Sequence, residues 1–264
     1  MNEQILKSAL AKLPLSQIEF YAEIGSTNDR AQELLEKGTP DGALVFAESQ
    51  TSGRGRLGRK WVTTPEAALA FSLALRPTRL ERERLAFFAP LAGLAVCRAL
   101  VEDYGLAAKV KWPNDVLLEN RKACGVLVEA AWLGSRLHGV VLGIGVNVAP
   151  GSVPPDNEVL FPATSVEQAL GRPVDRLELL AAILRQLFNL RKILGSGPFL
   201  RLWQEQLAFL GQEVRVDLLG PGEFVVGQVL GIDINGNLRL RTQDGKEVEV
   251  AAGDVRLRPV DLET

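Results

Sequence analysis

A short segment rich in glycine and arginine, residues 53–60, carries the strongest chemical signal in the chain. It reads Gly-Arg-Gly-Arg-Leu-Gly-Arg-Lys, so four cations and three glycines share eight positions. Glycine lets the backbone approach a ligand closely, while arginine and lysine supply charge to phosphate or carboxylate groups. An apolar run at 43–48 precedes the segment and predicts a strand that leads into it. We therefore expect an anion-binding loop at a sheet edge, and call residues 53–60 the basic loop.

Two phosphate-binding motifs match the basic loop only in part. The spacing of its three glycines fits the dinucleotide fingerprint G-x-G-x-x-G. That fingerprint requires a helix to begin at once, whereas Trp61-Val-Thr-Thr-Pro65 follows here. A Walker A loop requires Lys-Ser or Lys-Thr after its last glycine, and Arg59-Lys60 stands there instead. The context argues against both motifs and leaves a solvated basic turn as the structural alternative.

Three further segments place polar groups at turns or strand ends. Lys111-Trp-Pro-Asn-Asp115 is a turn-rich stretch that contains a lysine and an aspartate. Lys122 stands three residues before Gly125, at the start of an expected strand. Gly143-Ile-Gly-Val-Asn147 ends an apolar strand with an amide. Each segment alone is equally typical of ordinary structure: a capped turn, a surface lysine and a strand end.

Helices and strands are expected to follow one another irregularly around these segments. Ser26-Thr27-Asn28-Asp29 provides the capping signals of an amphipathic helix that stops at Gly38. Residues 149–164 contain four prolines and are expected to form a surface loop. This irregular order favours an α+β fold with a mixed, largely antiparallel sheet over a doubly wound sheet. The other expected helices are 81–104, 174–194 and 198–207, and the expected strands are 43–48, 69–75, 116–118, 124–132 and 137–147.

After Gly211 the sequence changes to short strands with alternating apolar residues. The turn dipeptides Asn235-Gly236 and Asp244-Gly245 are strong hairpin signals. We therefore expect two domains, a large one at 1–210 and a small β-barrel-like one at 211–264. Residues 1–20 are expected to be a short amphipathic lead-in to the first.

Composition limits the class of protein. The chain has 264 residues, 47% of them hydrophobic, and its formal net charge of −2 is unlike that of a dedicated nucleic-acid binder. Its two cysteines, Cys97 and Cys124, are too few for a disulfide framework and suit a reducing cytoplasm. The longest uncharged apolar run, 85–97, is interrupted by Pro90 and is too short to span a bilayer, so it predicts a buried helix. No signal-peptide core is visible at the N-terminus, and we expect a cytoplasmic protein without membrane association.

Taken together and in their order, the polar segments resemble those of the biotin protein ligase family. The resemblance covers about residues 24–150, and the β-rich tail is similar to that family's C-terminal SH3-like domain. It implies a catalytic domain with the mixed, largely antiparallel sheet of biotin ligases and class II aminoacyl-tRNA synthetases, followed by a small SH3-like β-barrel. The segments that carry it are Ser26–Asn28, Glu48–Trp61, Lys111–Asp115, Lys122–Glu129 and Gly143–Asn147.

The resemblance implies an activity, its substrates and its partners. Members of this family adenylate biotin with ATP and Mg²⁺ and release pyrophosphate. They then transfer the biotinyl group of biotinyl-5′-AMP to one lysine of a biotin carboxyl carrier domain, in acetyl-CoA carboxylase or a related carboxylase. Many bacterial members also carry an N-terminal DNA-binding domain, for which residues 1–20 are too short. The resemblance therefore implies the monofunctional form, which binds no DNA and is often a homodimer.

The matched motifs also imply roles for individual residues. Asp115 is implied either to hold Mg²⁺ or to orient the acceptor amine, and Arg56 to retain the biotinyl-AMP intermediate. Leu57 stands where many relatives carry another arginine, so the basic loop has one charge fewer. The catalytic group is Arg56, Lys111, Asp115 and Lys122. The biotin-binding group is Ser26, Thr27, Asn28, Gln50, Arg54, Gly55, Arg56, Lys122 and Gly125. The group for ATP and its adenine is Arg54, Arg56, Arg59, Trp61, Asn114 and Asn147.

Other functions and structural roles compete with this interpretation. Lipoate protein ligases use the same adenylation logic but a loop of the type Arg-Arg-x-Ser-Gly-Gly-Gly-x-Val-x-His-Asp, which this chain lacks. A non-enzymatic nucleic-acid binder would also use a basic loop, but the net charge argues against it. Helix capping is the structural alternative for Ser26 and Thr27, and turn or strand-end capping for Asn114 and Asn147.

The basic loop is expected to be mobile until an anion binds. Its glycines cost entropy to order, and its cations are expected to repel one another in the free protein.

Overall fold

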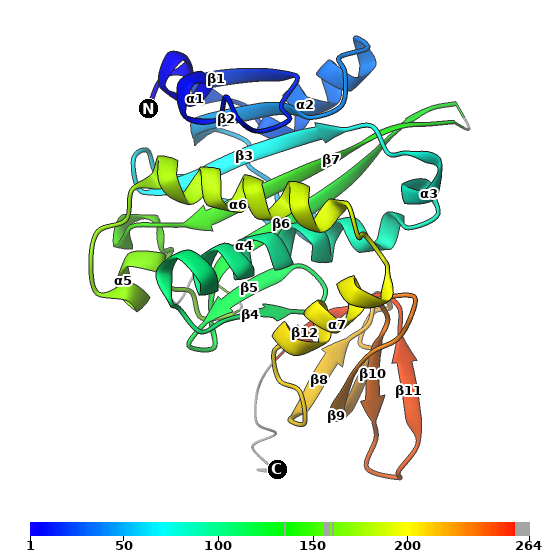
Figure 1. Ribbon diagram of the computed structural model, residues 1–264. Helices are drawn as coiled ribbons and strands as arrows, with labels where there is room; N and C mark the ends of the chain where they lie inside the picture. The colour runs from blue at the N-terminus through cyan, green and yellow to red at the C-terminus, as the bar shows by residue number, and fades with distance from the viewer. Residues whose placement is uncertain (135, 156–158, 160, 257–264) are drawn as a thin grey trace.

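The computed structural model describes residues 1–134, 136–155, 159 and 161–256. A large sheet with helices on both faces forms most of the molecule, and a small second sheet lies below it in the view of Figure 1. Helix α7 (Gly197–Gln206) lies where the two parts meet and contacts strands of both.

The large sheet has seven strands in the order β1-β2-β3-β7-β6-β5-β4. Only β1 and β2 are parallel, and every other neighbouring pair is antiparallel. The expected mixed, largely antiparallel sheet is therefore confirmed. Its strands are β1 Gln17–Ile24, β2 Ala43–Gln50, β3 Ala68–Leu75, β4 Ala108–Lys111, β5 Asp115–Leu118, β6 Arg121–Leu133 and β7 Arg136–Asn147.

Helices cover the large sheet on both faces. They are α1 Glu3–Ala9, α2 Thr27–Glu36, α3 Arg79–Arg82, α4 Phe88–Tyr104, α5 Val166–Leu170 and α6 Arg176–Arg191. Side chains of a strand point alternately to its two faces. Along β2, Leu44 and Phe46 accordingly join the larger core with α4 and α6, whereas Ala43 and Val45 pack in a smaller core with α2.

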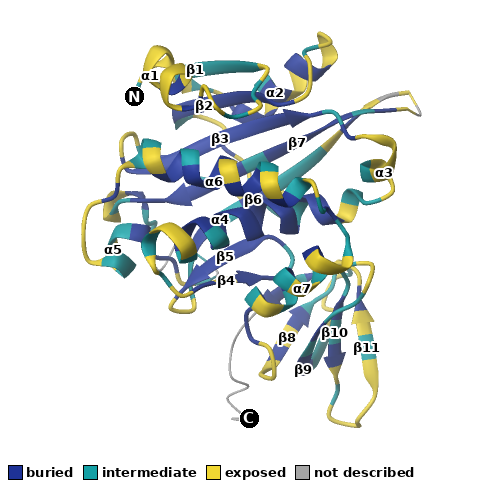
Figure 2. Ribbon diagram, viewed as in Figure 1, coloured by how far each residue is buried: buried dark blue, intermediate teal, exposed yellow. Residues whose placement is uncertain are grey.

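Helix α4 contains most of the long apolar run of the sequence, whose first three residues form a 3₁₀ turn. Residues 85–104 are long and apolar enough by composition to cross a membrane, but 67% of that window is buried inside the protein (Figure 2). Pro90 lies in the first turn of α4, where a missing backbone N–H removes no helical hydrogen bond. The expectation of a buried core helix is confirmed.

The small sheet has five strands in the order β11-β10-β9-β8-β12. Gly236 and Gly245 have φ values of 84° and 82° at the two expected hairpin turns, a conformation that glycine adopts without strain. Among residues 211–256 no pairing joins β11 to β12, so the expected barrel is an open sheet in its hydrogen bonding. The strands are β8 Glu213–Asp217, β9 Phe224–Ile232, β10 Leu238–Arg241, β11 Glu247–Val250 and β12 Asp254–Arg256.

Strand β4 was not among the expected strands, and the structure departs from expectation in three further places. The helix expected at 81–104 is broken, because Arg84 has a non-helical φ of −126° between α3 and a 3₁₀ turn at 85–87. The lead-in at 1–20 runs into β1, which pairs with β2. The short helix α5, capped by Ser165 and Gln168, was not expected.

The domain boundary at 210/211 stays a prediction. The chain passes from α7 to β8 at this point. Residues 156–158 and 160 of the expected surface loop, and 257–264 of the expected second domain, lie outside the described residues.

Candidate active site

One cavity of about 460 Å³ collects all the residues to which the sequence assigned a role. Its walls come from α2, the ends of β2 and β4, the strands β5 to β7, the basic loop and the start of β12. Their roles remain predictions, but their convergence from five separate segments is a property of the fold. These residues are Ser26, Thr27, Asn28, Gln50, Arg54, Gly55, Arg56, Arg59, Trp61, Lys111, Asn114, Asp115, Lys122, Gly125 and Asn147.

Two glycines of β7 make room for the side chains that line the cavity. Gly143 and Gly145 are two residues apart and so face the same side of the strand. A Cβ atom at Gly143 would lie 2.2 Å from Asn28 Oδ1, and one at Gly145 would lie 2.2 Å from the Trp61 ring. The two glycines therefore set the positions of Asn28 and Trp61.

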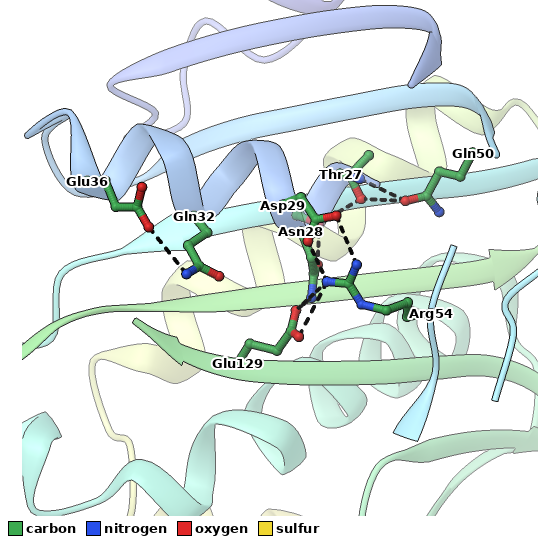
Figure 3. Close-up of polar contacts among 9 residues, drawn as sticks. Thr27, Asn28, Asp29, Gln32, Glu36, Gln50, Arg54 and Glu129 are labelled. Carbon is green, nitrogen blue, oxygen red and sulfur yellow. Dashed lines mark hydrogen bonds and ion pairs between the residues drawn. The ribbon is translucent and has the colours of Figure 1, made fainter. Parts of the chain in front are cut away.

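Neutral polar residues gather near α2: Thr27, Asn28 and Gln50 line the cavity, and the fully buried Ser72 bonds to two of them; we call these four residues the neutral end. Figure 3 shows Thr27 and Gln50 facing each other. The backbone N–H and the hydroxyl of Thr27 both contact Gln50 Oε1, at 2.8 and 3.0 Å. Ser26 is buried at the start of α2, but its side chain makes no capping bond, so helix capping does not account for it.

Hydrogen atoms are too few for the oxygen contacts of the neutral end. Only the hydroxyls of Thr27 and Ser72 can place a hydrogen in these contacts, one each. Turning the Asn28 amide over would not help, because its Nδ2 donates to Glu129 Oε2 at 2.6 Å. Two hydroxyl hydrogens therefore serve three oxygen–oxygen contacts, so acceptor oxygens outnumber donors here, and a ligand that donates N–H groups suits this end better than one that only accepts. The three contacts form a chain. Thr27 Oγ1 lies 3.0 Å from Gln50 Oε1 and 2.7 Å from Ser72 Oγ, and Ser72 Oγ lies 2.6 Å from Asn28 Oδ1.

The opposite end is charged, and we call Arg56, Lys111, Asp115 and Lys122 the charged end. Lys111 ends β4 and Asp115 begins β5, so the antiparallel pairing places them side by side. Asp115 lies 2.7 Å from Lys122 Nζ and 3.2 Å from Lys111 Nζ. Burial alone would raise the pKa of Asp115, but Lys122 and Lys111 outweigh it and hold the pKa below its ordinary value. Asp115 is therefore a buried anion that positions both lysines.

The small sheet completes the charged end. Lys111 Nζ lies 3.4 Å from Asp254 Oδ1 and donates to the Val255 carbonyl at 3.1 Å. Arg59 pairs with the same Asp254 carboxylate. The sequence analysis missed Asp254, because it is 195 residues from Arg59 and lies in no recognisable motif.

The arginines of the basic loop already have partners. Arg54 binds both oxygens of Asp29, at 2.9 and 2.5 Å, and lies 3.5 Å from Glu129 (Figure 3). Pairing with Asp29 raises the pKa of Arg54 above its ordinary value. Arg56 donates to Asn114 Oδ1 at 3.0 Å. Carboxylates thus pair with Arg54 and Arg59, but the charge of Arg59 still contributes to lowering the pKa of Arg56, after burial as the main cause, so the expected repulsion between loop cations is reduced rather than absent.

The residues expected near adenine differ in how much of their hydrogen-bonding capacity is in use. Asn114 Nδ2 donates to the Val126 carbonyl at 2.7 Å, and Asn147 Nδ2 to the Thr164 carbonyl at 3.1 Å. Trp61 Nε1 is buried and has no hydrogen-bond partner among the described residues. Both asparagines thus have structural partners as well as a place on the cavity wall, and their contact with adenine stays a prediction, while Trp61 keeps a free donor at the cavity.

Family models match most of the chain. The biotin/lipoate A/B protein ligase family matches residues 21–147, and the biotin protein ligase C-terminal domain matches residues 209–258. The first match contains every residue assigned to the site. The second contains Asp254 and the whole small sheet, so the charged end draws on both matched regions.

Individual relatives match over most of their length. The bifunctional ligase/repressor BirA of Bacillus subtilis is 32% identical over 97% of this chain and 79% of its own. A biotin–[acetyl-CoA-carboxylase] ligase of Paracoccus denitrificans is 36% identical over 88% of this chain and 98% of its own. The structure of the Aquifex aeolicus biotin protein ligase in complex with biotin and ATP superposes with a TM-score of 0.78 at 32% identity, over 92% of this chain and 99% of that one. The chain therefore belongs to the biotin/lipoate A/B protein ligase family, and within it to the biotin protein ligases.

Proposed function

We propose that this protein activates biotin with ATP as biotinyl-5′-AMP and transfers the biotinyl group to a lysine of a biotin carboxyl carrier domain. The observation that carries the choice of substrate is the hydrogen deficit at the neutral end, where three oxygen–oxygen contacts share two hydroxyl hydrogens. The ureido ring of biotin offers two N–H groups and one carbonyl. Biotin thus satisfies the neutral end without bringing a charge into it.

Lipoate fits the neutral end poorly. Its dithiolane ring has no N–H group to donate to the surplus acceptor oxygens of this end. The match of residues 209–258 to the biotin protein ligase C-terminal domain points in the same direction. The lipoate-type alternative is not favoured.

Adenylation takes place at the charged end. A carboxylate oxygen of biotin forms a bond to the α-phosphorus of ATP, the bond to the β-phosphate oxygen breaks, and pyrophosphate leaves with that electron pair. Two anions approach each other in this step, so fixed cations lower the barrier. Lys122 is 26% exposed at the cavity and is aimed by its 2.7 Å contact with Asp115. We assign it to the reacting carboxylate and the α-phosphate.

Transfer uses the same end of the cavity. The amine of the acceptor lysine attacks the acyl carbon of biotinyl-5′-AMP, loses a proton, and AMP leaves. Because AMP is the leaving group, no covalent enzyme intermediate is needed. Burial raises the pKa of the Cys124 thiol beside Lys122, which keeps it protonated and a poor nucleophile.

Asp115 is a poor candidate for a metal ligand. One of its oxygens is held by Lys122 at 2.7 Å and the other by Lys111 at 3.2 Å. The described residues also contain no group of three or more histidine, cysteine or acidic side chains that could hold a metal ion. Mg²⁺ is commonly bound through one or two carboxylates and substrate phosphates. We therefore assign Asp115 to the positioning of the two lysines and expect Mg²⁺ to enter with ATP.

The carrier, compartment and assembly of this protein follow as expectations. Two relatives are named for acetyl-CoA carboxylase, which makes the biotin carrier domain of that enzyme the expected acceptor. Both cysteines are free and buried, which suits a reducing cytoplasm. A homodimer, and the absence of DNA binding, remain expectations of the resemblance.

The test is the exchange of labelled pyrophosphate into ATP with biotin, with lipoate, or with no acid. We expect saturable exchange with biotin and none above the no-acid control with lipoate. Exchange supported equally by lipoate would overturn the choice of substrate, and no exchange with either acid would overturn the proposed activity.

A further inference from the structure

A carboxylate of the small sheet occupies cations that suit a phosphate. Asp254 begins β12, lines the cavity, and has a side chain that is 16% exposed. Its oxygens contact Lys111 at 3.4 Å and pair with Arg59. Burial alone would raise the pKa of Asp254, but the charges of Lys111 and Arg59 outweigh it and hold the pKa below its ordinary value. The site thus contains an internal anion between two cations.

The two cations differ in what would hold them without Asp254. Lys111 would keep its contacts with Asp115 at 3.2 Å and with the Val255 carbonyl at 3.1 Å. Arg59 is 40% exposed on the basic loop and makes its recorded ion pair with Asp254. Carboxylates and phosphates bind arginine and lysine through the same oxygen–hydrogen contacts. An incoming phosphate would therefore compete with Asp254 for the two cations.

We propose that Asp254 is a positioning residue that holds Lys111 and Arg59 in the free enzyme and gives them up to the pyrophosphate portion of ATP. This inference rests on the proposed adenylation of biotin. It makes the small sheet a part of the nucleotide site: ATP binding exchanges one anion for another and releases a contact between the two domains. Asp254 thus orders the two cations before ATP binds, but its negative charge also competes with the ATP phosphates for them.

The proposal also accounts for the greater solvent exposure of the Asp254 carboxylate. Asp115 is 6% exposed and is held by two lysines, whereas Asp254 is 16% exposed. A carboxylate with more solvent access can be hydrated when its partners leave, so breaking its ion pairs costs less. Asp254 is thus suited to exchange, and Asp115 to permanent positioning.

The experiment compares wild type with Asp254→Asn, which keeps the size of the side chain and one acceptor oxygen but removes the charge. We expect the dissociation constant for inorganic pyrophosphate, measured by calorimetry, and the KM for ATP in biotin-dependent exchange to fall about two- to fivefold, as expected for a partly exposed charge pair. The KM for biotin should not change. Asp254→Glu keeps the competing charge and should not tighten pyrophosphate binding.

Asp244→Asn is the matched control. Asp244 lies on the exposed turn between β10 and β11 of the same sheet and pairs with Lys246. This variant should bind pyrophosphate as wild type does. Unchanged or weaker pyrophosphate binding by Asp254→Asn would overturn the exchange. If wild type shows no biotin-dependent exchange, the proposed function fails, while calorimetry with pyrophosphate alone still decides the role of Asp254.

Discussion

The two ends of the cavity are built in opposite ways. The neutral end takes its groups from residues 27–72, on α2, β2 and β3, and joins them through neutral hydrogen bonds. The charged end takes its groups from residues 56–255 and joins them through ion pairs that cross from the large sheet to the small one. The first is a local structure, and the second depends on how the whole chain folds.

This difference separates recognition from chemistry. The neutral end distinguishes ligands by the hydrogen atoms they bring, which affects binding of the ring and little else. The charged end stabilises charge that develops during phosphoryl transfer, which affects turnover. Substitutions at the two ends should therefore change different kinetic constants.

Lys122→Ala should have the largest effect. It removes the exposed cation assigned to the reacting carboxylate, so kcat for adenylation should fall by about two to three orders of magnitude, as for loss of one oxyanion donor. The KM for biotin should change far less. Pyrophosphate release measures both constants, and Lys37→Ala, on the exposed end of α2, is the control. If Lys122→Ala raised the KM for biotin and left kcat unchanged, the proposed separation of binding and catalysis between the two ends would be wrong.

Substitution of two glycines of β7 should affect the binding of biotin and of ATP separately. A methyl group at Gly143 collides with Asn28, and one at Gly145 collides with Trp61. Gly143→Ala should raise the KM for biotin about tenfold, or ~1.4 kcal/mol, with a smaller change for ATP; Gly145→Ala should do the reverse. Gly197→Ala is the control, because the nearest atom to its new methyl would be 3.7 Å away. Equal changes in both KM values for both variants would show that the ends are not separable.

Glu48→Gln should have the smallest effect on the site, because it acts on stability. Glu48 pairs with Arg176 at 2.7 Å, which ties β2 to α6. We expect the free energy of unfolding at pH 7 to fall by about 2 kcal/mol, the range for a hydrogen bond to a charged group. Denaturation with urea measures this loss, and the ratio of the two KM values should stay near that of wild type.

The pH dependence of this loss has a definite sign. Burial alone would raise the pKa of Glu48, but its bonds with Arg176 and the N-terminal amine outweigh it and hold the folded-state pKa below 4.5. The wild-type advantage is therefore complete above pH 4.5 and disappears as the pH falls through the lower folded-state pKa. An advantage over Glu48→Gln that grows on acidification would contradict this assignment.

The neutral end was easier to predict from the sequence than the charged end. Thr27, Asn28 and Gln50 belong to short contiguous motifs, and the structure brings them to one cavity. Ser72 was missed because a serine inside an apolar strand carries no motif. Asp254 was missed because its contacts with Lys111 and Arg59 join positions far apart in the chain.

The elements show the same limit. The strands with alternating apolar residues and the hairpin glycines predicted the small sheet, because these signals are local. The pairing of β1 with β2 depends on a parallel neighbour, and β1 is a half-buried edge strand with charged residues, so its own sequence does not identify it. The partners of Arg54 lie on α2 and β6, and no local pattern reveals that they would pair with this cation of the basic loop.

The most direct test of the account is a single-turnover reaction with purified protein, biotin and ATP, followed by mass spectrometry. The account predicts biotinyl-5′-AMP and pyrophosphate in equal amounts, with AMP appearing only after a biotin carboxyl carrier domain is added and becomes biotinylated on lysine. Formation of ADP and phosphate, or no biotinyl-5′-AMP above a control without protein, would contradict it.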